Sequence, residues 1–250
     1  QIQSFGNLSS YREIYLDTFQ RIGHKPDLVV FGFANTALQD FAERSPSANT
    51  SEILRRNLEY TAGKWNKPVY RQHELSRMGV QVLELQNGKH IWFIDNEYGD
   101  RAVELYRALQ EHGAKKVVVL GTAGSLNPKF KLGEIVSPEK FLGSGSETFS
   151  NQFPSAVRKS GTLVHVDSPS LESQRWLRSQ ISRGADLVDV ELQKIATEAR
   201  RQNSSLSGYL VISDELNSPH PVDYTLWSES HREQSKRALR PIINHHLREA

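Results

Sequence analysis

The 250-residue chain contains no cysteine, which excludes disulfide bonds, thiolate nucleophiles and cysteine-ligated zinc. It also contains no apolar run close to the roughly 20 residues that a membrane-spanning helix needs. The chain has no marked excess of positive or negative charge, because it contains 31 Lys and Arg residues and 29 Asp and Glu residues. No overall field would therefore attract nucleic acid or an anionic membrane. We expect a soluble, cytoplasmic protein with neither as a partner; an exported effector would have the same composition.

Short apolar runs alternate with segments of helical periodicity along nearly the whole chain, and no internal repeat is present. The expected strands cover residues 28–31, 80–85, 90–94, 117–120, 162–166, 185–188 and 209–212. The expected helices cover residues 10–22, 36–44, 51–62, 100–112, 168–181, 192–199 and 224–247. A hairpin turn is expected at 87–88 and a mobile loop at 143–151. This alternation predicts an α/β fold in a single domain, residues 1–250, with a mixed, mostly parallel sheet flanked by helices.

The segment 117–125 is the natural centre of such a sheet. Residues 117–120 form an unbroken apolar run, which is typical of a strand buried on both faces. The small residues 121–124 are expected to end that strand in a turn whose backbone N–H groups can hold an anion or a sugar hydroxyl. A tight turn without a ligand is the alternative interpretation.

Polar residues follow three of the expected strands, at 121–124, 189–191 and 213–214. If these strands are adjacent and parallel, the polar groups meet at one edge of the sheet. One carboxylate there can accept hydrogen bonds from a ribose diol, while another donates a proton to a leaving group. The ordinary alternative is that these acids favour the first turn of a helix or cap a turn.

These motifs resemble those of the nucleoside phosphorylase family, which includes purine nucleoside phosphorylases and methylthioadenosine/adenosylhomocysteine nucleosidases. Residues 121–128 with 132–136 resemble its central signature, and 189–191 resemble its acidic ribose-binding motif. Residues 212–214 match its Ile-Ser-Asp motif. The order and spacing fit from about residue 80 onwards, whereas residues 1–79 are a divergent N-terminal part.

The resemblance implies cleavage of the N-glycosidic bond of a purine nucleoside or a nucleotide-like substrate. In that reaction Asp214 would donate a proton to N7 of the departing purine, with Ser213 orienting its carboxyl group. Glu191 would bind the ribose 2′- and 3′-hydroxyls, and Val190 would pack beneath the sugar.

Five further positions are expected to bind substrate by the same resemblance. Thr122 and the amides of Ala123 and Gly124 would face the sugar and the nucleophile. Pro169 stands where the family places a base-stacking aromatic residue, beside Ser170. No metal or resident cofactor is expected, phosphate is a possible co-substrate, and the family implies a homo-oligomer.

The nucleophile is left open, because two family features are missing. The turn at 32–36 lacks the acid that activates water in hydrolytic members, and Val119 replaces an arginine that holds phosphate in phosphorolytic members. Asn35 is a candidate to orient water, while Arg44 or Arg101 are candidates to reach an anion. We favour hydrolysis. The alternative function is a catalytically diverged nucleoside- or nucleotide-binding module.

Overall fold

The structure of the chain, a computed structural model, describes residues 8–33, 80–84, 88–95, 97–143, 146–148, 159–217 and 229–249. The helices expected at 36–44 and 51–62 lie outside these ranges, as do Asn35, Arg44 and Asn87.

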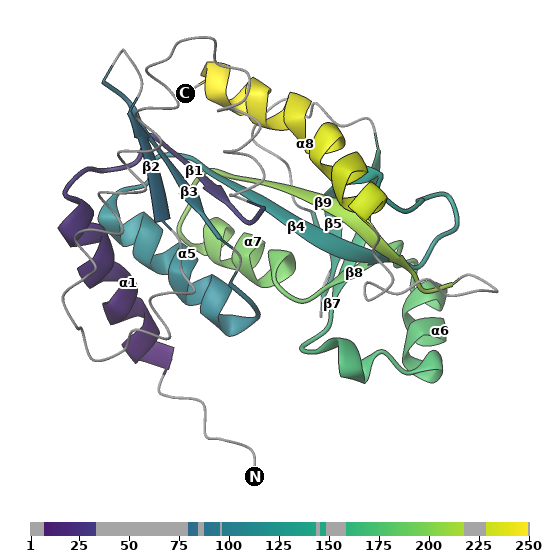
Figure 1. The fold of residues 1–250 in the computed structure, drawn as a ribbon. Coiled ribbons are helices and arrows are strands. Elements are labelled where there is room, and N and C mark those ends of the chain that lie inside the picture. Colours follow the sequence, from purple (N-terminus) through teal and green to yellow (C-terminus); the bar gives the residue numbers. More distant parts are fainter. Residues whose placement is uncertain are drawn as a thin grey trace.

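The strands of the described chain form one mixed sheet (Figure 1). They are β1 Leu28–Phe31, β2 Val80–Glu84, β3 His90–Ile94, β4 Val117–Ser125, β5 Ile135–Leu142, β6 Ser146–Thr148, β7 Ser160–His165, β8 Leu187–Asp189 and β9 Leu206–Glu215. Their order is β2-β3-β1-β4-β8-β7-β5-β6, and β9 pairs with both β4 and β5. Strands β4, β9, β5, β7 and β8 therefore close into a barrel-like ring, from which β1, β3 and β2 extend beside β4. Parallel pairings are in the majority, as the sequence predicts.

Helices cover the sheet on both faces (Figure 1). They are α1 Leu8–Ile22, α5 Asp100–His112, α6 Gln174–Ser182, α7 Leu192–Arg201 and α8 Glu229–Glu249, with a short 3₁₀ helix, η1, at Pro169–Leu171. Helices α1, α5 and α7 lie on one face and α8 lies on the other. None of the described helices combines the length and the apolar character needed to span a lipid bilayer.

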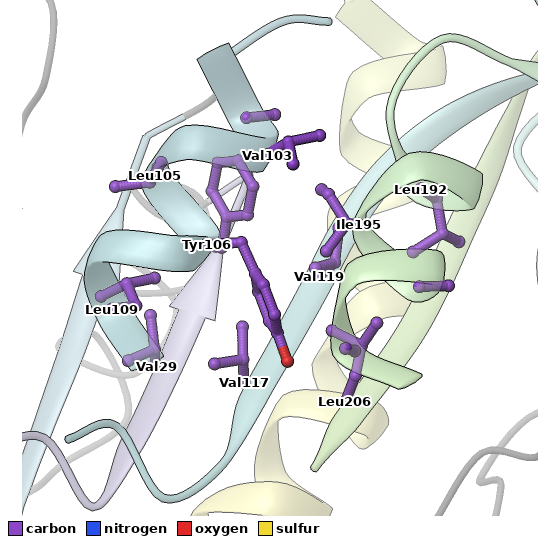
Figure 2. Packing of buried hydrophobic residues seen from close by; sticks show 14 of the residues in the cluster. Val29, Val103, Leu105, Tyr106, Leu109, Val117, Val119, Leu192, Ile195 and Leu206 are labelled. Atoms are coloured by element: carbon purple, nitrogen blue, oxygen red, sulfur yellow. The ribbon is translucent and has the colours of Figure 1, made fainter. Parts of the chain in front are cut away.

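The alternation of side chains along β4 explains the two layers of core. Val117 and Val119 point to the face that carries α1, α5 and α7, where Tyr106 packs between α5 and α7 (Figure 2). Val118 and Leu120 point to the opposite face and pack against α8. A strand buried on both faces must be apolar at every position, which is why this run is continuous.

The expected strand at 117–120 is correct but too short, and the prediction that residues 121–124 end it in a turn is wrong. Strand β4 continues to Ser125 and pairs with β9 along its whole length, with an irregularity between Ala123 and Gly124. Neighbouring side chains fill the space beside the glycines: a Cβ at Gly124 would lie 2.6 Å from Leu216 Cδ1. The small residues therefore extend the strand through a crowded part of the sheet instead of ending it.

Two other expected segments are corrected by the structure. The helix expected over 168–181 is divided into η1 and α6, because Ser168 and Ser173 each accept a hydrogen bond at the start of their own helix. The loop expected over 143–151 contains β6, which pairs with β5 in antiparallel fashion.

Candidate functional site

The ends of three strands lie side by side around Gly124. This residue is paired with Asp214 of β9 on one side and with Val188 of β8 on the other. Strand β9 is parallel to β4, as expected, whereas β8 is antiparallel to it. Because β8 is antiparallel to β4, the chain after Val188 runs back along β4 towards Thr122. The polar residues that follow Val188 therefore still lie beside the end of β4.

Ser213 and Asp214 occupy the last part of β9 and not a turn after it. Ser213 is buried, and its hydroxyl lies within hydrogen-bond distance of Asp214 Oδ2 and 3.4 Å from the carbonyl oxygen of Ala123. The serine hydroxyl thereby joins the Asp214 carboxyl group to the backbone of β4.

Asp189 organises the turn from β8 into α7. Its Oδ2 accepts hydrogen bonds from the N–H groups of Leu192, at 2.8 Å, and Glu191, at 3.4 Å. These are N–H groups at the start of a helix, which otherwise have no acceptor. Burial raises the pKa of Asp189 to about 6, although the backbone hydrogen bonds oppose this rise. Asp189 thus has a structural task that its position in the motif alone does not reveal.

Glu191 is held against the start of α5. Its Oε1 accepts a hydrogen bond from the N–H of Gly99 at 3.2 Å, in a turn where Gly99 has a φ of 58°. Burial, followed by the negative charge of Asp189, raises the pKa of Glu191 to about 8. The carboxyl group is therefore mostly protonated at neutral pH and can both donate and accept hydrogen bonds.

Lys194 connects three segments around this carboxyl group. Its ammonium lies 2.8 Å from Asp100 Oδ1 at the start of α5 and 2.9 Å from Asp167 Oδ1 after β7. His165 Nε2 lies 3.1 Å from the same oxygen of Asp167. The hydrogen bond from Lys194 is the largest of the causes that lower the pKa of Asp167 to about 2. The charge of Lys194 is thus matched by the carboxylates of Asp100 and Asp167.

Glu172 is a candidate site residue that the sequence interpretation missed. It is half-buried directly after η1, where burial and then the negative charge of Asp214 raise its pKa to about 7. The two carboxyl groups are thus close enough to influence each other's protonation. In the sequence, Glu172 is marked only as an acid three residues after Pro169, the position expected to stack on the base. The pattern of the surrounding residues does not distinguish it.

Large exposed apolar side chains flank these carboxyl groups. Tyr98 is 66% exposed and precedes Gly99, the partner of Glu191, while Leu171 is 55% exposed and precedes Glu172. Pro169 and Ser170 are also exposed, and the Ser170 N–H donates a hydrogen bond to the Ser168 hydroxyl. Leu171 and Pro169 therefore both expose apolar surface in the η1 segment that precedes Glu172.

The other expected residues lie along β4 and the turn after β8. Ala123 is buried, while Thr122 and Val190 are half-buried. Arg101, considered as an anion ligand, lies 3.2 Å from Glu97 and stacks over the Tyr11 ring at 4.5 Å. Its charge is therefore matched by a buried carboxylate. Within the described ranges, no three His, Asp or Glu side chains are grouped to hold a metal ion.

Comparison with known proteins agrees with this fold. The sequence model of the phosphorylase superfamily matches residues 28–159, more than half of the chain. Among solved structures, the chain is similar to purine nucleoside phosphorylase of Schistosoma mansoni in complex with adenosine, with 16% sequence identity and a TM-score of 0.54. That similarity covers 95% of this chain and 93% of the other, and at this identity it concerns the fold. No curated protein sequence matches the chain significantly.

Proposed function

Because the chain belongs to the phosphorylase superfamily, we propose that it is an enzyme that cleaves the N-glycosidic bond of a purine nucleoside or a nucleotide-like relative. The observation that carries this proposal is the pairing of Gly124 with both Val188 and Asp214, since it brings the ends of the three strands that carry the expected motifs side by side. The adenosine in the similar Schistosoma mansoni structure supports a purine nucleoside as the substrate.

Asp214 is the general acid in this proposal. Its carboxyl group donates a proton to N7 of the base, so that the electron pair of the glycosidic bond leaves with a neutral purine. Glu172, whose pKa is raised to about 7 next to Asp214, keeps a proton close to the leaving group at neutral pH. Ser213 orients the Asp214 carboxyl group through its hydroxyl.

Glu191 is the ribose clamp. A protonated carboxyl group accepts a hydrogen bond at one oxygen and donates one from the other, which suits the two adjacent hydroxyls of a ribose. Its hydrogen bond with the Gly99 N–H fixes the direction from which it approaches the sugar. As positive charge develops on the ribose in an oxocarbenium-like state, the carboxyl oxygens of this group would also stabilise that charge.

We favour water over phosphate as the nucleophile. Carboxyl groups surround this region, at Asp189, Glu191, Asp214 and Glu172, and each of them repels an anionic co-substrate whenever it is ionised. Lys194 on α7 and Arg101 on α5, the two helices that begin at the site, already face carboxylates. Water adds to C1′ of the sugar as the glycosidic bond breaks, and its proton passes to Asp214, which is a carboxylate once it has protonated the base.

The test is to incubate the protein with adenosine, inosine, methylthioadenosine and AMP, with and without phosphate, and to follow release of the free base by chromatography. We expect release without phosphate, and a loss in kcat/KM of about 100-fold or more in Asp214→Asn. The matched control is Glu215→Gln, because the next residue of β9 points to the other face of the strand and accepts a hydrogen bond from the Leu132 N–H.

Three results would change the proposal. Release only in the presence of phosphate would make the enzyme a phosphorylase. Tight nucleoside binding without turnover would favour the diverged binding module. Full activity of Asp214→Asn would remove Asp214 from the role of general acid.

A further inference from the structure

A polar cleft of about 440 Å³ lies where α1 meets the C-terminal ends of α5 and α7. We name it the arginine cleft after its lining residues, which are Arg12, Arg107, Gln110, Glu111, Arg201 and Gln202. The candidate site lies at the opposite ends of the same helices, at Gly99 before α5 and Glu191 before α7. With a rise of 1.5 Å per residue, the ten residues of α7 separate the two places by roughly 15 Å.

Buried carboxylates hold two of the arginines in place. Arg107 Nη1 lies 2.5 Å from Glu104 Oε1, and its Nη2 lies 2.9 Å from Glu198 Oε2. Arg201 Nη2 lies 2.6 Å from Glu198 Oε1. Both glutamates are under 10% exposed, whereas the Arg201 side chain is 68% exposed. The guanidinium groups are thus fixed before any ligand arrives, which lowers the entropy cost of binding.

The cleft retains hydrogen-bond donors after these ion pairs are counted. Within the described part of the chain, Arg107 Nε and Gln110 Nε2 are buried without a hydrogen-bond partner. Among the described residues, Arg12 makes a loose ion pair with Glu111, at 3.8 Å. A guanidinium group carries five N–H donors and matches phosphate oxygens in pairs. The lining therefore favours a ligand that is rich in acceptor oxygens.

The size and the remaining polarity of the cleft narrow the class of ligand. Its volume lies within the range of pockets for small organic molecules and exceeds what a single phosphate ion fills. The Glu111 carboxylate is an acceptor for hydroxyl groups, and the carboxamides of Gln110 and Gln202 both donate and accept. We propose that the arginine cleft binds a small phosphorylated molecule, a sugar phosphate or a nucleotide, at a site separate from the nucleoside site.

Calorimetric titration at low ionic strength tests this proposal, with ribose 5-phosphate and ADP as probes. We expect both probes to bind, with an affinity that falls as salt is added. In the double variant Arg12→Ala/Arg201→Ala the affinity should fall at least 10-fold. The matched control is Arg200→Ala, which removes an exposed arginine next to Arg201 on α7 but outside the cleft. Failure of both probes to bind, or equal affinity in the double variant, would overturn the proposal.

A second variant guards against a folding defect, because Arg201→Ala removes one partner of the buried Glu198. Gln110→Glu leaves the ion pairs of Arg12, Arg107 and Arg201 intact and adds a negative charge, and we expect it to weaken binding at least 10-fold as well. Parent-like affinity in this folded variant would contradict the proposal. Asp214→Asn should bind both probes as the parent does, which separates this proposal from the function proposed for the nucleoside site.

Discussion

Asp189 and Glu191 are two residues apart, and their surroundings give their carboxyl groups different tasks. Asp189 accepts hydrogen bonds from the first N–H groups of α7, so its carboxyl group is committed to the local fold. Glu191 receives one backbone hydrogen bond, from Gly99, and is less completely enclosed. A ligand can therefore reach Glu191 without dismantling the helix start. This difference supports Glu191, and not Asp189, as the group that contacts substrate.

The raised pKa of Glu191 predicts that the folded protein becomes less stable as the pH rises from 6 to 8. Below about 4.5 both the folded and the unfolded chain hold the proton, but above this value only the folded chain keeps it, until its own pKa of about 8. The free energy of unfolding then falls by about 1.4 kcal/mol per pH unit from this group. Asp189, with a pKa of about 6, affects the pH dependence of stability mostly below pH 6. Above pH 6, Glu191 therefore contributes more to this dependence than Asp189 does.

Glu191→Gln should therefore unfold at a higher temperature than the parent at pH 8, and its pH dependence between 6 and 8 should be flatter. Thermal denaturation at several pH values measures this, together with base release, which the variant should lose in large part. Glu13→Gln, at an exposed position of α1, is the control and should follow the parent. A variant with the same pH slope as the parent would show that Glu191 is ionised in the folded state.

Among the elements, helices and strands with a clear apolar pattern were predictable, and those shaped by their neighbours were not. Strand β1 and helix α5 have the bounds that periodicity predicts, and Gly113 ends α5 with a φ of 97°. The extension of β4 beyond Leu120 depends on β8 and β9, whose side chains crowd its glycines. A single sequence window contains no information about that crowding. Glu172 was missed for the same reason, since its significance comes from Asp214 on a distant strand.

The contact between β9 and α7 gives a prediction at this scale. A Cβ at Gly208 would lie 2.7 Å from Leu192 Cδ1, in the first residue of the helix that follows Glu191. Gly208→Ala should destabilise the protein by about 1–3 kcal/mol through overpacking. Leu192→Ala should destabilise it by about 2–5 kcal/mol through the cavity that it leaves.

The double variant Gly208→Ala/Leu192→Ala should be more stable than the sum of the two losses predicts, because the added methyl group fills part of the cavity. Urea denaturation of the four proteins measures the coupling. Additive losses would mean that the backbone of β9 shifts to accept the methyl group, and that α7 does not rest on Gly208 in the way that the distances indicate.

In the whole molecule, the candidate site and helix α8 lie on opposite faces of the sheet. Helices α5 and α7 begin at the candidate site on one face, while α8 packs its apolar residues against Val118, Leu120 and Tyr209 on the opposite face (Figure 1). Strand β4 belongs to both layers. A change in the packing of α8 can therefore alter the strand that carries Gly124 without touching the substrate. The packing between α8 and the sheet, which we call the α8 layer, also contributes to the stability of the whole fold.

A buried histidine on helix α8 predicts how the protein loses stability in acid. His246 is buried on α8, with its Nε2 3.0 Å from the Tyr209 hydroxyl, and burial lowers its pKa to about 4. The positive charges of His245 and Lys116 contribute to the same lowering of the pKa, after burial. An unfolded chain takes up a proton at this histidine near pH 6.5, while the folded chain stays neutral down to about 4. The contribution of this histidine to the free energy of unfolding therefore falls by about 1.4 kcal/mol per pH unit as the pH drops through this window.

His246→Gln keeps a hydrogen-bonding group for Tyr209 but does not titrate, so its loss of stability between pH 6.5 and 5 should be smaller than that of the parent. Urea denaturation at these two pH values measures the difference, and His24→Gln, at an exposed position of the opposite layer, should behave as the parent. His246 and Glu191 act in opposite directions, because His246 weakens the fold as the pH falls below 6.5 and Glu191 weakens it as the pH rises towards 8. If His246→Gln and the parent lose stability equally between pH 6.5 and 5, His246 does not stay neutral in the folded protein over this range.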